Sequence, residues 1–77
     1  MMLNRNRSER FLKALQALGP CEFRTQDVYP LGVPLRMSPI TVRKTLSQLE
    51  KTDHLVRLAF GVYITMDTYM AHPEWYR

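Results

Sequence analysis

Hydrophobic residues recur every three or four positions in two stretches of the chain, a spacing that places them on one face of a helix. In the first stretch these residues are Phe11, Leu12, Leu15 and Leu18. Ser8 is a suitable N-cap in front of them, and Gly19-Pro20 is a typical helix stop behind them. The pattern predicts a helix that begins at Ser8, after a flexible basic arm over residues 1–7.

The second stretch begins with the strongest helix start in the chain. Ser38 is an N-cap residue, and Pro39 follows it at the first helical position, where an N–H group has no partner in any case. The apolar positions of this helix are Val42, Leu46 and Leu49. The pattern continues to about Lys51 and predicts a helix over 38–51.

A shorter helical pattern lies between the two longer ones. Thr25 offers an N-cap, and Val28 and Leu31 are candidates for an inward face. Pro30 and Gly32 restrict this helix to about two turns.

The pattern after the third helix is typical of strands. Residues 55–58 and 62–65 are rich in β-branched and large apolar side chains, and a glycine-bearing turn joins them at 59–61. We expect a β-hairpin here, while residues 21–23 are either a minor strand or a loop. The aromatic C-terminal extension, residues 66–77, has no pattern that assigns its secondary structure.

This order of elements is typical of a winged helix-turn-helix domain. The expected fold is mainly α with a small β-hairpin: three helices, of which the first two support the third, followed by the hairpin as a wing. The third helix of such a domain needs one apolar face for the core and one polar face for the major groove. We expect the domain over residues 8–65, with residues 66–77 either folding over the first helix or forming a dimer contact.

The polar face of the helix over 38–51 supplies most candidate DNA contacts. They are Ser38, Ile40, Thr41, Arg43, Lys44, Ser47, Gln48 and Lys51. Lysine and arginine pair with phosphates or guanine, and glutamine pairs with adenine. Ile40 has two interpretations, a contact to a thymine methyl group or a packing residue at the helix start. The charged face as a whole is either a DNA interface or an ordinary solvated exterior.

Four further cations are candidate phosphate contacts: Arg57 in the wing, and Arg5, Arg7 and Arg10 in and beside the arm. A basic arm can follow a DNA backbone or enter a minor groove, and it can equally be a solubilising tail. The chain has 11 Lys and Arg against 7 Asp and Glu, a net charge of +4. This excess mildly favours an anionic partner such as nucleic acid.

The composition also speaks against several other classes of protein. Cys21 is the single cysteine, which excludes an intrachain disulfide and a Cys-rich zinc site, and we expect it to be a small apolar filler. His54 and His72 lack metal-ligand spacing, and neither a catalytic acid pair nor a glycine-rich phosphate loop is visible. No apolar run is long enough to span a bilayer. We therefore expect a cytoplasmic, non-enzymatic protein with no metal, no cofactor and no membrane partner.

Several segments together resemble bacterial winged-helix regulators. They are Thr25-Gln26-Asp27-Val28, the pattern S-x-x-T-V-x-x-x-L-x-x-L that starts at Ser38, Leu55-Val56-Arg57-Leu58, and Gly61-Val62-Tyr63-Ile64. The chain is most similar to the N-terminal DNA-binding domain of abortive-infection-type antitoxins and to small fimbrial regulators. The resemblance covers about residues 8–65, and it implies that the patterned helix enters the major groove. The wing tip, residues 59–61, departs from the family because it has no basic residue.

Two functions follow as hypotheses. The first is a sequence-specific regulator of transcription that binds double-stranded DNA as a homodimer, in a bacterium, phage or plasmid. The alternative is a winged-helix protein–protein docking module, such as a phage- or plasmid-encoded inhibitor or an assembly factor. The uncharged wing tip at Phe60 and the aromatic extension favour this alternative. Binding of single-stranded nucleic acid is a weaker third hypothesis, because the aromatic residues form no evident stacking row.

Overall fold

The first helix, α1 (Met2–Gln16), is longer than the sequence pattern predicts. The computed structural model describes residues 2–76, with side chains from residue 7 onward. The predicted helix start at Ser8 is wrong, because the helix already begins at Met2 and includes the residues expected to form an arm. Residues 2–7 contain neither glycine nor proline, and arginine is a good helix former, so nothing in this polar stretch interrupts the helix.

The end of α1 leaves two residues outside the core that were expected inside it. Gln16 is the last helical residue, and Gly19 then turns the chain with a φ of 87°, a conformation that glycine adopts readily. Leu18 lies in this turn and is 43% exposed, so its assignment to the buried face is wrong. Cys21 is also exposed rather than an apolar filler, and its Sγ lies 3.6 Å from the carbonyl oxygen of Leu18.

Three short helical pieces replace the single short helix that was expected. They are the 3-10 helix η1 (Thr25–Val28), the α-helix α2 (Tyr29–Gly32) and the 3-10 helix η2 (Val33–Leu35). Arg24, not Thr25, is the N-cap, and its backbone N–H donates to Oδ2 of Asp27 at 3.2 Å. Val28 is fully buried as predicted, and Leu31 is partly buried against the core.

The third long element, α3 (Pro39–Lys51), has the bounds and the inward face that the sequence predicts. The Oγ atom of Ser38 accepts a hydrogen bond from the backbone N–H of Thr41 at 3.2 Å, which caps the helix as expected. Val42, Leu46 and Leu49 are all buried. The remaining sides of α3 are available for function.

Gly32 lets α2 approach α3 closely. A Cβ atom on this residue would lie 2.8 Å from Cγ2 of Val42 and 3.0 Å from Cβ of Met37. Carbon atoms in ordinary contact are about 3.5–4.0 Å apart. The backbone of Gly32 has right-handed helical angles, φ −82° and ψ −18°, so lack of space and not backbone conformation requires glycine here.

The predicted β-hairpin is present and gains a third strand. The strands are β1 (Phe23–Arg24), β2 (Leu55–Ala59) and β3 (Val62–Thr65). They form an antiparallel sheet in the order β1-β3-β2, in which Phe23 pairs with Tyr63 and Arg57 also pairs with Tyr63. The register shifts between Arg57 and Ala59, just before the turn, where Gly61 has a φ of 72°.

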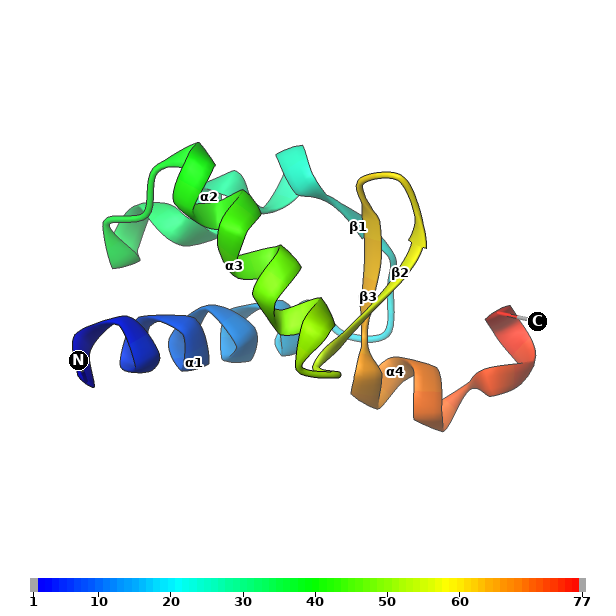
Figure 1. Cartoon of the computed structure of the whole chain (residues 1–77). Coiled ribbons are helices and arrows are strands. Elements are labelled where there is room, and N and C mark those ends of the chain that lie inside the picture. Colours follow the sequence, from blue (N-terminus) through cyan, green and yellow to red (C-terminus); the bar gives the residue numbers. More distant parts are fainter. Residues whose placement is uncertain (1, 77) are drawn as a thin grey trace.

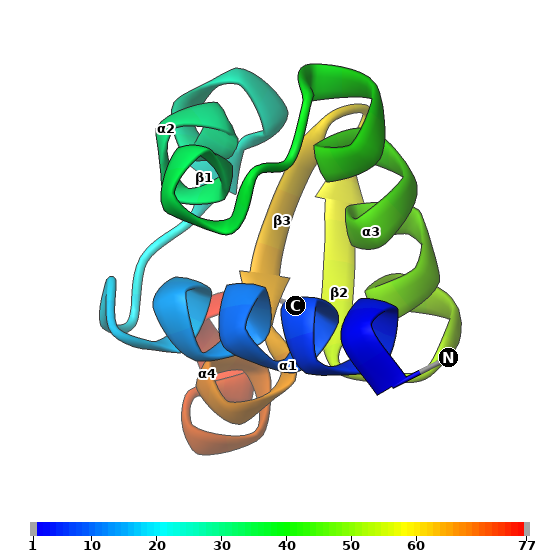
Figure 2. The same ribbon diagram turned by 90° about the vertical axis from the view of Figure 1, so that its left-hand side faces the viewer.

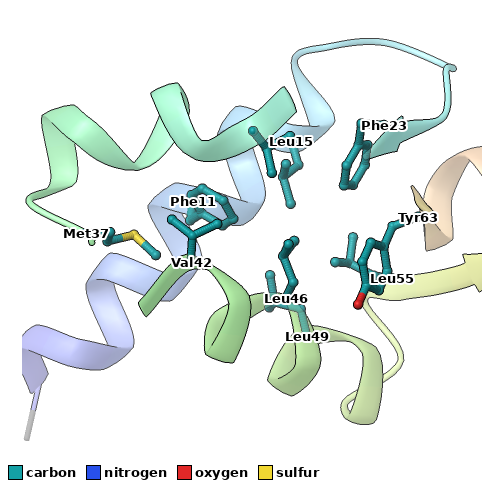
Figure 3. Packing of buried hydrophobic residues seen from close by; sticks show 10 residues of the cluster. Phe11, Leu15, Phe23, Met37, Val42, Leu46, Leu49, Leu55 and Tyr63 are labelled. Carbon is teal, nitrogen blue, oxygen red and sulfur yellow. The ribbon is translucent and has the colours of Figure 1, made fainter. Parts of the chain in front are cut away.

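The helices and the sheet enclose one hydrophobic core. Its buried residues are Phe11, Leu15, Phe23, Val28, Met37, Val42, Leu46, Leu49, Leu55 and Tyr63. Figure 3 shows the α1 side chains Phe11 and Leu15 on one side of this cluster, with Val42 and Leu46 of α3 facing them and the sheet residues at one end. The chain is thus mainly helical with a small antiparallel sheet, which agrees with the predicted class at this level (Figures 1 and 2).

The C-terminal extension forms the helix α4 (Met66–Ala71) and the 3-10 helix η3 (Pro73–Tyr76). Thr65, the last residue of β3, is also the N-cap of α4, because its Oγ1 accepts from the backbone N–H of Thr68 at 3.2 Å. The Nε2 atom of Gln16 donates to Oδ2 of Asp67 at 3.1 Å and joins α1 to α4. In the described part of the chain, no helix is long and apolar enough to cross a membrane.

Candidate nucleic-acid interface

The N-terminal end of α3 is fixed by the hydroxyl groups of two predicted contact residues. Besides accepting from the Thr41 backbone, Oγ of Ser38 lies 3.0 Å from Oγ1 of Thr41, so the two hydroxyl groups are hydrogen-bonded to each other. Thr41 is also half-buried, whereas Ser38 is exposed. The geometry gives both hydroxyls a capping role that a DNA contact would have to share.

The outward ridge of α3 carries Ile40, Lys44 and Lys51, all of them exposed. Residues at these positions lie about opposite the buried face, since each residue turns the helix by about 100°. Ile40 is 59% exposed, so the interpretation of Ile40 as a packing residue is wrong. An exposed apolar side chain beside a lysine is suited to contact both a base and the phosphate backbone.

The edge of α3 that faces α1 brings a predicted arm residue to the predicted helix. Lys44 and Gln48 line a shallow hollow together with Arg7 of α1. Nη1 of Arg7 lies 3.5 Å from the carbonyl oxygen of Arg36, the residue that ends η2 with a φ of 58°. Arg7 therefore lies near the start of α3, while the side chain of Arg5 lies outside the described residues.

The opposite edge of α3 faces the hairpin. Arg43 is exposed there, and Ser47, which was expected on the outward face, is half-buried. Arg57 of β2 lies on the same side, and its Nε is 4.0 Å from Oε2 of Glu50 in the last turn of α3. This ion pair is partly exposed, with side-chain exposures of 52% and 36%, so solvent screens it and it contributes at most about 1 kcal/mol to folding stability. Glu50 partly neutralises the charge of Arg57.

A second hollow lies between α3 and the sheet, and it contains a cation that the sequence interpretation did not single out. Arg24 of β1 lines this hollow together with Arg43, Arg57 and Phe60. The alternation along β1 contains a signal for Arg24, because side chains of successive strand residues point to opposite faces and Phe23 is buried. That signal can be used only if β1 is recognised as a strand, and a strand of two residues is too short to be recognised from the sequence.

The hairpin turn and the start of α3 lie on the same side of the molecule, above α1 in Figures 1 and 2, and Figure 1 shows them apart along its length. Phe60 at this turn is 95% exposed and is the most exposed large apolar residue in the described chain. Arg24, Arg43 and Arg57 thus line the same hollow as this uncharged turn. Within residues 2–76, no group of three His, Cys, Asp or Glu side chains is placed to hold a metal ion.

Comparisons with models of protein families, with characterised proteins and with solved structures find no match to this chain. The resemblance to winged-helix regulators therefore depends on the sequence segments that carry it and stays a prediction.

Proposed function

We propose that the protein is a winged-helix regulator of transcription that binds double-stranded DNA with α3 in the major groove. The observation that carries this proposal is the division of α3 into a buried apolar face and an exposed face that has no carboxylate before Glu50. With 13 residues, α3 is about 20 Å long, and its diameter suits a major groove about 12 Å wide. The hairpin beside α3 takes the place of the wing.

The proposal assigns different roles to the ridge and the edges of α3. Lys44 and Gln48, on the ridge and the α1-facing edge, contact base edges, and Ile40 contacts a thymine methyl group. Arg43, on the hairpin-facing edge, and Lys51, at the C-terminal end of the ridge, contact phosphates, which positions the helix without reading sequence. Ser38 and Thr41 mainly hold the start of α3 in place, as their mutual hydrogen bond supports.

The proposed regulator acts as a homodimer that blocks or recruits transcription at a promoter of a bacterium, phage or plasmid. One module contacts few base pairs, and two modules related by symmetry read two half-sites. Met70 and Trp75 in the C-terminal extension are 70% and 54% exposed, which supports a subunit contact at this extension.

Fluorescence anisotropy with a labelled mixed-sequence duplex tests the proposal, first at low and then at physiological salt. We expect binding that weakens steeply with salt, and a Lys44→Gln variant that binds about 5- to 160-fold more weakly, since one good base or phosphate contact contributes about 1–3 kcal/mol. Lys13→Gln, which makes the same change at an exposed position of α1, is the matched control and should bind like the wild type. Equal affinity of the Lys44→Gln variant and the wild type would refute the assignment of α3.

A docking module for another protein is the second candidate, and Phe60 favours it. At 95% exposure, this phenylalanine offers a large apolar side chain that a partner protein would bury. Absence of duplex binding even at low salt would favour this candidate. A pull-down with the wild type and a Phe60→Ser variant would then identify a partner that depends on this side chain.

A further inference from the structure

Three arginine side chains from three different elements line the hollow between α3 and the sheet. They are Arg24 of β1, Arg43 of α3 and Arg57 of β2, and no carboxylate is among the residues that line it. We propose that this hollow binds a phosphate group of the DNA backbone beside the groove that α3 enters. This inference rests on the proposed function, and it adds a contact that lies mostly outside α3.

The charge of the hollow is the first argument for an anion. Arginine stays protonated under all ordinary conditions, so three arginines around one hollow make its electrostatic potential positive, which attracts an anion. Among residues 2–76, Arg57 is the one of the three that forms an ion pair, with Glu50 at 4.0 Å. The planar guanidinium group presents parallel N–H donors that match two oxygens of one anion, so a phosphate group fits this set of residues.

The remaining lining residues fit a phosphate in a nucleic acid better than an isolated ion. Gln26 and Tyr29 add neutral polar groups to the hollow. Phe60 stands at its edge and is almost fully exposed, so its ring is available to pack against a sugar next to the bound phosphate. A hollow that combines guanidinium groups with an apolar rim matches the alternation of charged phosphate and apolar sugar along a backbone.

The position of the hollow relates it to the proposed recognition helix. Arg43 belongs both to α3 and to the hollow, so a phosphate held there lies directly beside α3. The hairpin turn lies on the same side of the molecule as the first turn of α3, above α1 (Figures 1 and 2). A backbone that follows the edge of the major groove therefore passes from α3 to the hollow without leaving the surface. Such a contact fixes the register of the protein on DNA and reads no sequence.

An Arg24→Gln variant tests the inference, because Arg24 is exposed and is not part of α3. The apparent dissociation constant for the same labelled duplex is measured across a series of salt concentrations for the wild type and the variant. We expect the slope of log K against log salt to become shallower by about 0.9, because the variant neutralises one phosphate fewer than the wild type. Arg24→Lys should restore most of the slope, and Lys13→Gln should leave it unchanged. Circular dichroism confirms that each variant is folded.

A second series of duplex titrations distinguishes a backbone phosphate from free phosphate. Duplex binding by the wild type and by Arg24→Gln is measured with inorganic phosphate added at constant ionic strength. If added phosphate weakens duplex binding by the wild type more than by Arg24→Gln, the hollow binds phosphate from either source. If added phosphate weakens both equally, and the salt slope of Arg24→Gln is still shallower than that of the wild type, the hollow binds only a backbone phosphate. If the wild type binds the duplex and Arg24→Gln has the same salt slope, this inference is overturned and the proposed function is not. A wild type that does not bind the duplex overturns the inference and the proposed function together.

Discussion

Replacement of Gly32 by alanine is expected to destabilise the protein, although alanine is the better helix former. Gly32 ends α2 with right-handed helical angles, and there alanine should be favoured by about 0.5–1 kcal/mol. The added methyl group, however, would lie 2.8 Å from Cγ2 of Val42 and 3.0 Å from Cβ of Met37. Both side chains are buried, so neither can move away without disturbing the core.

The size of this effect follows from the two opposing contributions. One extra methyl group in a tightly packed core destabilises by about 1–3 kcal/mol. Because this packing cost exceeds what alanine gains as a better helix former, we expect the folding stability to fall by about 1–2 kcal/mol. A loss of this size lowers the Tm of a domain of this size by roughly 4–15 °C. Since Cγ2 of Val42 is the nearest atom, Val42→Ala should relieve the clash. The double variant should therefore be at least about 0.5 kcal/mol more stable than the sum of the two single changes predicts.

The assay is a double-mutant cycle from thermal and urea unfolding, followed by circular dichroism. Gly19→Ala is the matched control, since Gly19 has a φ of 87° and nothing lies within 4 Å of a Cβ atom there. Gly19→Ala should lower the folding stability by about 1 kcal/mol through backbone strain alone, and this effect should not couple to Val42→Ala. A Gly32→Ala variant as stable as the wild type, or a cycle with no coupling, would refute the close approach of α2 to α3.

Three further changes have definite expected outcomes. Ser38→Ala removes the cap of α3 and should lower the free energy of unfolding by about 1 kcal/mol in urea titrations; an unchanged midpoint would contradict the cap. Glu50→Gln frees Arg57 from its carboxylate, so duplex affinity measured by anisotropy should rise about 2- to 5-fold, whereas weaker binding would speak against a phosphate contact at Arg57. Trp75→Ser should shift sedimentation equilibrium toward monomer without loss of folding, and an unchanged mass distribution would remove the proposed dimer contact.

Local signals in the sequence sufficed for α3 and for the hairpin. The Ser38 cap acts within three residues, as its bond to Thr41 shows, so it can be identified without any knowledge of the rest of the chain. The buried face of α3 follows equally from the helical repeat. The start of α1 was misplaced because a good N-cap residue such as Ser8 also fits inside a helix when the preceding residues are helix formers.

The parts of the site that sequence reasoning missed depend on contacts between distant segments. β1 is only two residues long and exists because it pairs with β3, so neither the strand nor the direction of Arg24 is evident locally. The ion pair between Glu50 and Arg57 likewise joins a helix end to a strand. Hydrophobic spacing predicts which residues are buried, but it does not predict which charged side chains meet across two elements.

Thr65 connects the sheet directly to the C-terminal extension. It ends β3 and caps α4, and it is buried, so no linker separates the two elements. The direction of α4, and with it that of Trp75, is consequently coupled to the hairpin and through the sheet to α3. In a dimer formed through the extension, the direct connection at Thr65 would therefore set the distance between the two copies of α3. One residue inserted after Thr65 would rotate the α4 face by about 100° and change the half-site spacing that the dimer accepts.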